Sequence, residues 1–307
     1  MMPKIEYISK NFGVDRLDLI NRINSVIDDY SAQGYSLTLR QVYYQMVARA
    51  IIPNNERSYK NLGVLISEAR LAGLIDWNAI EDRTRNLKGK SHWQTPGSMI
   101  DSAAYSYHLD HWNGQKNYVE VWVEKDALVG IVGQICGELD VNFFSCRGYV
   151  SQSEMWGAAR RLKRRQDNGQ QIVLLHLGDH DPSGRDMSRD IQDRLVTFET
   201  HGVDFHRLAL NMNQIEQYGP PPNPTKITDS RATKYIQEFG HECWELDALE
   251  PQVISDLISK NVRKYRDDRL YKSVLKQERE EKGMLEEVAQ HWSGVANNWD
   301  DIKERYC

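Results

Sequence analysis

Residues 118–210 alternate short β-branched runs with amphipathic segments, and this alternation limits the possible folds more than any other feature. Strands are predicted near 118–123, 141–145, 172–177 and 203–210, and helices near 126–138, 152–166 and 184–195. Strands that alternate with helices form a mostly parallel sheet with helices on its faces. The sequence therefore predicts an α/β domain of Rossmann-like type.

Acidic residues follow two of these strands at the point where each strand ends. Glu124 comes after the first strand, and Asp179 and Asp181 come after the third. Open α/β sheets bind ligands at the carboxyl ends of their strands. Alternate residues of an extended segment point to the same side, so Asp179 and Asp181 are expected to lie together. Carboxylate oxygens are ligands that Mg²⁺ prefers. We therefore predict a magnesium site here, although acids at strand ends can also be plain surface residues.

The neighbouring residues carry further expectations. Pro182 and Gly184 fit a tight turn in which the backbone approaches closely. His180 is expected to face away from the acids. Three later acids either complete a second metal position or simply lie at a strand end and a favourable helix start, and the second interpretation is preferred. These three are Glu245, Asp247 and Glu250.

The first hundred residues have helical periodicity instead. Helices are predicted near 15–32, over 39–50 with Thr38 as cap, and from Ser58 to Gly73, followed by an extended segment over 75–85. Three helices and a short ribbon are the outline of a winged helix, in which the third helix enters the major groove and the wing contacts the backbone. The predicted DNA contacts are Lys60 and Arg70 near the reading helix and Arg83 and Arg85 on the wing.

Charge is distributed unevenly along the chain. Residues 36–95 contain nine Lys or Arg and five acids, a net charge of +4, whereas residues 101–307 contain 26 basic and 34 acidic residues, a net charge of −8. A locally basic module is compatible with nucleic-acid binding because local fields matter more than the total. The same charge also fits an ordinary solvated surface.

The remaining predictions concern the domain boundaries and the cellular location. Residues 86–97 are predicted to be a linker, which divides the chain into a winged-helix domain over 1–95 and a parallel-sheet domain over 96–307. A further strand is predicted over 241–246, and residues 252–290 are predicted to be a charged helical extension. The sequence contains no secretory signal, no membrane span and no CxxC pair among its four cysteines, so a cytoplasmic location is expected.

Two motifs carry a resemblance to a known family. Val123-Glu-Lys-Asp-Ala127 and the Asp-x-Asp-Pro-x-Gly of residues 179–184 resemble the Toprim domain of topoisomerases, primases and some nucleases. Upstream, Leu39-Arg-Gln-Val-Tyr-Tyr44 resembles the catalytic segment of the topoisomerase VI A subunit and its meiotic double-strand-break relatives. The stretch 243–249 is similar to the family's Glu-Leu-Glu-Ala-Leu. A departure lies at Gly148-Tyr-Val-Ser151, where the family has Gly-Tyr-Pro-Asp.

The resemblance implies a reduced A subunit with type IIB topoisomerase-like activity. Tyr44 would attack a phosphodiester of double-stranded DNA and remain joined to the 5′ end. Glu124, Asp179 and Asp181 would hold Mg²⁺, with Glu124 also a candidate acid or base, and Lys125 would contact DNA. The family forms homodimers in which each tyrosine meets the acids of the other subunit. Its longer leading segment binds an ATPase B-type subunit, and that partnership is in question here because only about 35 residues precede the motif.

The residues themselves give partial support for this assignment. A spacing of four puts Arg40 and Tyr44 on one helical face, so Arg40 can bind a phosphate and favour the phenolate. Tyr43 points elsewhere and is expected to be packed. Two alternatives stay open: a hydrolytic Toprim nuclease in which Tyr44 is structural, and a DNA-binding protein with a silent Toprim fold. The basic run over 160–165 is either a backbone contact or a solvated helix face.

Overall fold

The computed structural model describes residues 4–80 and 90–299. These residues divide into two compact units, one made of Met1–Arg85 with Asn117–Lys264 and the other of Asn86–Lys116 with Tyr265–Cys307. This division differs from the two contiguous domains predicted over 1–95 and 96–307, because the segment before the sheet packs with the C-terminal helices. Within the described residues, no helix combines the length and apolar composition that a membrane crossing requires.

The first unit contains a parallel sheet, as the sequence predicted. Its four strands lie in the order β2-β1-β3-β4, and every neighbouring pair is parallel. The strands are β1 (Asn117–Val123), β2 (Asn142–Ser145), β3 (Gln171–Leu177) and β4 (Asp204–Ala209). The central pair, β1 and β3, is buried almost throughout. Residues buried on both faces explain why these strands read as continuous apolar runs.

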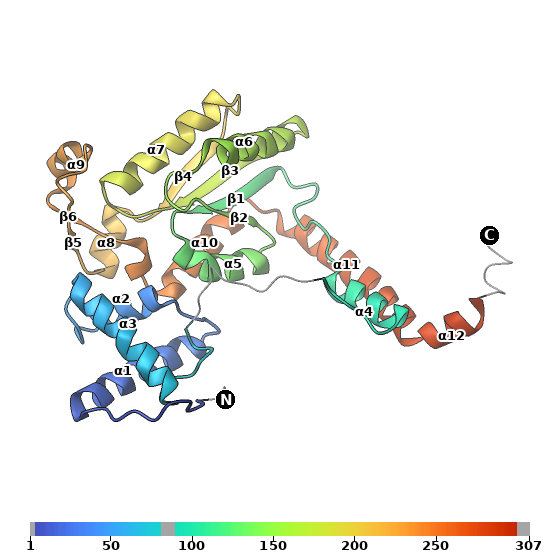
Figure 1. The fold of residues 1–307 in the computed structure, drawn as a ribbon. Coiled ribbons are helices and arrows are strands. Elements are labelled where there is room, and N and C mark those ends of the chain that lie inside the picture. Colours follow the sequence, from blue (N-terminus) through green and yellow to red (C-terminus); the bar gives the residue numbers. More distant parts are fainter. Residues whose placement is uncertain (1–3, 81–89, 300–307) are drawn as a thin grey trace. The chain divides into compact units, whose positions relative to one another are not determined.

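Helices cover both faces of this sheet. Figure 1 shows α6 and α7 on one face and α5 and α10 on the other. Their bounds are α5 (Val129–Glu138, after the 3-10 turn η1, Asp126–Leu128), α6 (Gln152–Asp167), α7 (Pro182–Thr197) and α10 (Pro251–Arg263). The apolar side of α6 packs with β3 and with Trp122 of β1. The crossovers therefore form the doubly covered sheet that alternation predicts, and the α/β part of the fold is confirmed.

The segment after β4 is less regular than predicted. It contains α8 (Met212–Tyr218), α9 (Ala232–Phe239), a two-stranded ribbon of β5 (Asn223–Pro224) and β6 (Glu242–Cys243), and the 3-10 turn η2 (Leu246–Ala248). The strand predicted over 241–246 is therefore wrong beyond Cys243. Backbone bonds between His180 and Trp244 hold the chain beside the Asp-x-Asp segment, and Leu246 begins a turn.

Three helices at the N-terminus have their own apolar core. They are α1 (Val14–Ser31), α2 (Leu39–Ala48) and α3 (Glu56–Leu71). Thr38 caps α2 through a capping box with Gln41, and Asn55 caps α3, which explains why α3 begins before the predicted Ser58. Val42, Met46 and Ile66 lie in the shared core. Beyond α3, residues 75–79 form bends and turns, so the predicted extended segment is wrong there. Ile80 forms a parallel bridge with Leu37, and the predicted residues 81–85 lie outside the described part.

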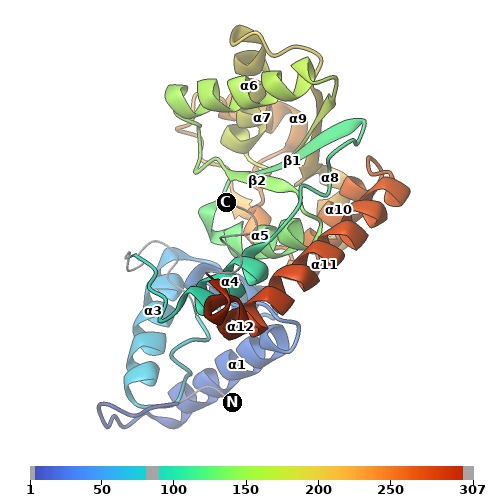
Figure 2. The same cartoon turned by 90° about the vertical axis from the view of Figure 1, so that its right-hand side faces the viewer.

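The second unit is helical. It consists of α4 (Pro96–Ser106), α11 (Asp268–Gln290) and α12 (Trp292–Asn297), and α11 runs alongside α4 (Figure 2). Thr95 caps α4 and Pro96 occupies its first turn, so the last two residues of the predicted linker, 96 and 97, belong to the helix. The charged helical stretch predicted over 252–290 contains two helices, α10 and α11, and between them the chain passes from the first unit to the second.

Candidate active site

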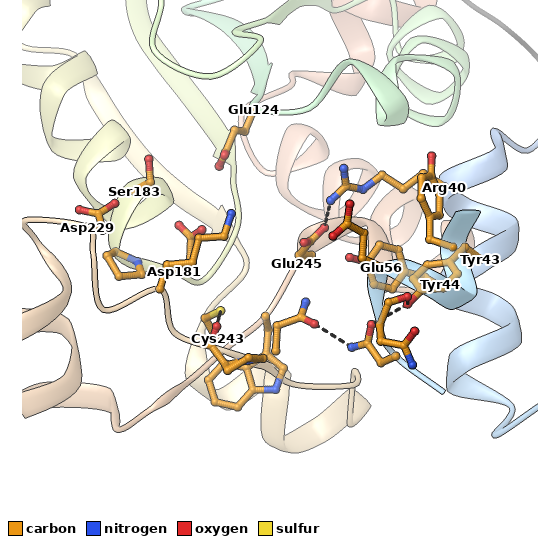
Figure 3. Close-up of a pocket in the computed structure, with 18 residues that line it drawn as sticks. Arg40, Tyr43, Tyr44, Glu56, Glu124, Asp181, Ser183, Asp229, Cys243 and Glu245 are labelled. Carbon is orange, nitrogen blue, oxygen red and sulfur yellow. Dashed lines mark hydrogen bonds and ion pairs between the residues drawn. The ribbon is translucent and has the colours of Figure 1, made fainter. Parts of the chain in front are cut away.

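One cavity of about 880 Å³ in the first unit brings the predicted tyrosine and two of the predicted acids together. Arg40, Tyr43 and Tyr44 of α2 line it on one side (Figure 3). Glu124, at the end of β1, and Asp181, at the start of α7, line it on the other, with Glu245 between the two groups. Tyr44 and Asp181, which are 137 positions apart in the sequence, thus border the same space, and α2 packs against η2.

Glu124 and Asp181 are held by backbone N–H groups. The Oε2 atom of Glu124 accepts a hydrogen bond from Asp179 N at 2.9 Å. Asp181 caps α7, and its Oδ1 accepts from Gly184 N at 2.6 Å. Burial and the nearby Asp181 raise the pKa of Glu124. A cation placed between two neighbouring carboxylates offsets their mutual repulsion. Glu124 and Asp181 therefore fit a hard divalent ion such as Mg²⁺.

Asp179 has a different position from the one predicted. It is buried, does not line the cavity, and its Oδ1 accepts from Leu246 N at 2.8 Å. Its Oδ2 lies 2.8 Å from Lys125 Nζ. Burial raises the pKa of Asp179 to about 8, and Lys125 opposes that shift. Among the described residues, three His, Cys, Asp or Glu ligand atoms within 4.8 Å of one another occur only at His108, His111 and Glu278, so the three acids do not meet that closely.

Gly184 makes the close approach of this loop possible. A Cβ on Gly184 would lie 2.3 Å from the carbonyl oxygen of Asp179 and 3.0 Å from Glu124 Oε2. Side-chain atoms cannot occupy such a space, so only glycine allows α7 to begin directly against the acid loop. The expected close backbone approach is confirmed at this position.

Arg207 on β4 organises the same loop from behind, and the sequence interpretation missed it. Its guanidinium donates to the carbonyls of Gly178 at 3.0 Å, Asp179 at 2.5 Å and Gly184 at 2.9 Å. It also donates to Ser188 Oγ at 2.6 Å. Burial lowers the pKa of Arg207 to about 10. The sequence feature that could have indicated this role is the arginine itself, which precedes the apolar residues at the end of the strand. A buried cation needs hydrogen-bond acceptors around it.

The cationic residues beside Tyr44 are occupied by carboxylates of the same chain. Arg40 pairs with Glu245 Oε2 and, through Nε, with Asp247 Oδ2 at 3.0 Å. Lys125 Nζ lies 2.7 Å from Glu245 Oε2 and 3.1 Å from Asp247 Oδ1. Glu245 and Asp247 are therefore counter-ions here. Glu250, the third acid of this group, lies at the start of α10 and accepts a hydrogen bond from Tyr30.

Tyr44 lies against this network. Its ring centroid is 5.8 Å from the guanidinium carbon of Arg40, as the shared helical face predicted. Burial and a hydrogen bond with Glu245 raise the pKa of the Tyr44 phenol, while Arg40 lowers it. Tyr43 is packed against Tyr59 and donates to Asn54 Oδ1 at 2.9 Å. In this arrangement Tyr44 is a neutral phenol, and the carboxylate of Glu245 opposes its ionisation.

Other predicted residues are dispersed. His180 is buried beside Tyr235 and Trp244 and faces away from the cavity. Lys60 is exposed and pairs with Glu56 at 2.7 Å. Arg70 donates to the Ile80 carbonyl at 2.5 Å and lies against Trp77, which gives it a packing role. Arg83 and Arg85 lie outside the described residues.

The basic run over 160–165 lies on α6, and neither of the two interpretations left open describes all of it. Arg161 forms paired hydrogen bonds of 2.7 and 2.9 Å with buried Glu120, and Arg165 stacks on Tyr118. Arg160 is exposed. Part of the run is therefore structural and part faces solvent.

Comparisons with known proteins gave no relatives: no family model matches the chain, and no curated protein or solved structure matches it.

Proposed function

We propose that this protein is a Mg²⁺-dependent DNA-cleaving enzyme of the topoisomerase VI A type. One observation carries the proposal: a single cavity is bordered by a tyrosine–arginine pair and by two carboxylates at the carboxyl end of a parallel sheet. The tyrosine supplies a nucleophile and the carboxylates supply oxygen ligands for a cation. The helices α1, α2 and α3 are proposed to form the DNA-binding winged helix that carries Tyr44.

The chemistry is a transesterification. The Tyr44 oxygen forms a bond to the phosphorus and loses its proton, the bond from phosphorus to the 3′ oxygen breaks, and the 3′ oxygen takes up a proton. Arg40 can bind the phosphate and favour the phenolate. Glu124, whose pKa is raised by burial, is suited to exchange a proton with the leaving oxygen.

Mg²⁺, when bound, would supply positive charge beside the phosphate oxygens. The residues that would hold it are Glu124 and Asp181, which border the cavity, with Asp179 behind them. One tyrosine cuts one strand, so a double-strand cut requires two chains. We therefore propose a homodimer as the active species.

A trapping experiment tests the proposal. The purified protein is incubated with duplex DNA and Mg²⁺, denatured with detergent, and analysed for DNA that migrates with protein until a protease is added. We expect the adduct on 5′ ends only, and none when a chelator replaces Mg²⁺. Products with free 5′ phosphates and no adduct would contradict the transesterase.

A hydrolytic nuclease is the second candidate, and one observation favours it. Glu245 and burial both raise the pKa of Tyr44, which makes the phenol a poor nucleophile until the network around it changes. In the hydrolytic enzyme, the acids would activate water and Tyr44 would only pack. The same trapping experiment separates the two, since hydrolysis leaves no protein on the DNA.

A further inference from the structure

A second cluster of ligand-type side chains lies in the helical unit. The segment after α4 contains His108 and His111, and α11 contains Glu278. Glu278 Oε2 lies 3.0 Å from His108 Nδ1 and 2.7 Å from His111 Nε2, and it accepts a hydrogen bond from Leu109 N at 2.7 Å. Two imidazole nitrogens therefore converge on one carboxylate oxygen.

The surroundings hold these three side chains in place. His111 is 4% exposed, and its ring packs edge-on against Tyr271 of α11. Beyond the cluster, Gln115 and Asp267 exchange two hydrogen bonds, from Gln115 Nε2 to Asp267 O at 2.9 Å and from Asp267 N to Gln115 Oε1 at 2.7 Å. Both segments are thus fixed before any ligand arrives, and fixed donors lose little entropy on binding.

We propose that His108, His111 and Glu278 form a Zn²⁺ site. Their three ligand atoms lie within 4.8 Å of one another. Two nitrogens and one carboxylate oxygen are a donor set typical of zinc, whereas Mg²⁺ prefers oxygen alone. The site would leave one tetrahedral position for water.

Only small movements are needed to admit the ion. Zinc bonds of about 2.0–2.1 Å imply that tetrahedral ligand atoms lie roughly 3.3 Å apart. The donor atoms now lie 2.7 and 3.0 Å from Glu278 Oε2, so each must withdraw by a few tenths of an ångström. Each neutral imidazole must also carry its proton on the other ring nitrogen, Nε2 for His108 and Nδ1 for His111.

The proposed role of the ion is to join α11 to the segment that follows α4. His111 and Glu278 are 167 residues apart in the sequence, so the folded chain brings the ligands of a shared ion together from two distant segments. A ligand that binds only the folded state stabilises it by mass action. The site is chemically distinct from the carboxylate cavity and is independent of DNA cleavage.

Zinc titration of chelator-treated protein by calorimetry tests the proposal. We expect one Zn²⁺ per chain and a rise in melting temperature with Zn²⁺ that Mg²⁺ does not reproduce. His108→Ala removes a half-exposed ligand with little packing loss and should weaken Zn²⁺ binding at least tenfold. Glu278→Gln retains an acceptor for Leu109 N and should have the same effect. His92→Ala, an exposed histidine of the same unit, is the matched control and should bind as the wild type does.

Two results would overturn the site. One is the absence of saturable Zn²⁺ binding by the wild type. The other is unchanged affinity in folded His108→Ala and Glu278→Gln, which would place any bound zinc elsewhere. Far-ultraviolet circular dichroism establishes that each variant is folded, so a loss of Zn²⁺ binding can be assigned to the removed side chain and not to unfolding.

Discussion

Arg40 and Glu245, 205 residues apart in the sequence, form an ion pair at the edge of the cavity that Tyr44 lines. Lys125 reaches the same Oε2 atom at 2.7 Å, and the charge of this carboxylate raises the pKa of the Tyr44 phenol. Two cations that share one carboxylate oxygen are groups that can also bind a phosphate. Under the proposed function, the Glu245 carboxylate would therefore compete with a DNA phosphate for Arg40 and Lys125.

Tyr44→Phe should abolish both cleavage and the protein–DNA adduct, because it removes the proposed nucleophilic oxygen and keeps the ring. Tyr43→Phe is the matched control. Its hydroxyl donates to Asn54, so this variant should lose about 1 kcal/mol of stability and continue to cut. Adduct formation is measured on denaturing gels and stability by urea unfolding. A Tyr44→Phe protein that cuts at the normal rate would make the hydrolytic nuclease the correct function.

Glu245→Gln should strengthen DNA binding, because it releases Arg40 and Lys125 for phosphate. It should also move the pH profile of adduct formation to lower pH, since Glu245 raises the pKa of Tyr44 and the variant removes that effect. Glu242→Gln, on the exposed start of the same segment, is the control. DNA affinity is measured by fluorescence anisotropy at several salt concentrations. Equal affinity and an unshifted profile in the two variants would show that Glu245 does not compete with phosphate.

Acid should destabilise the protein partly through Glu245. Arg40 and Lys125 lower the pKa of Glu245 to about 2, although burial opposes this. Its stabilisation is therefore complete above its ordinary pKa of 4.5 and is lost as the pH falls toward 2. The free energy of unfolding of Glu245→Gln should then depend less steeply on pH between 4.5 and 2 than that of the wild type. Parallel curves from urea titrations at each pH would contradict this role.

The strands of the sheet were predictable because short stretches of sequence specify them. Buried runs such as 118–123 and 172–177 specify strands by themselves, and the acids at their ends follow from the parallel arrangement. Thr38 was predicted correctly as the cap of α2, whereas the cap of α3, Asn55, was missed. The helical periodicity also placed Arg40 beside Tyr44.

The contacts between distant segments were not predictable. Nothing near Lys125 in the sequence indicates that Glu245 and Asp247 would surround it, because that depends on the turn η2 after a two-residue strand. Asp179 was expected to bind a metal together with Glu124 and Asp181, yet the contacts with Leu246 N and Lys125 hold it away from the cavity. The histidine cluster of the helical unit was missed for the same reason, since its carboxylate comes from α11.

Gly184→Ala tests whether the acid loop must lie directly against α7. A methyl group there would stand 2.3 Å from the Asp179 carbonyl oxygen, which is backbone and cannot rotate away. The loop would have to move, so we expect a loss of about 1–3 kcal/mol in unfolding free energy and loss of cleavage. Glu124 would be displaced with it, because its Oε2 accepts from Asp179 N.

Gly157→Ala is the control for this last variant. Gly157 lies within α6, and an added Cβ there would meet no atom within 4 Å. Alanine is a better helix former than glycine by about 0.8–1.0 kcal/mol, so this variant should be as stable as the wild type or more stable. Urea unfolding and the cleavage assay on both variants give the comparison. If Gly184→Ala matches Gly157→Ala in both measurements, the approach of α7 to the acid loop is not required, and the site does not depend on the geometry that surrounds Glu124.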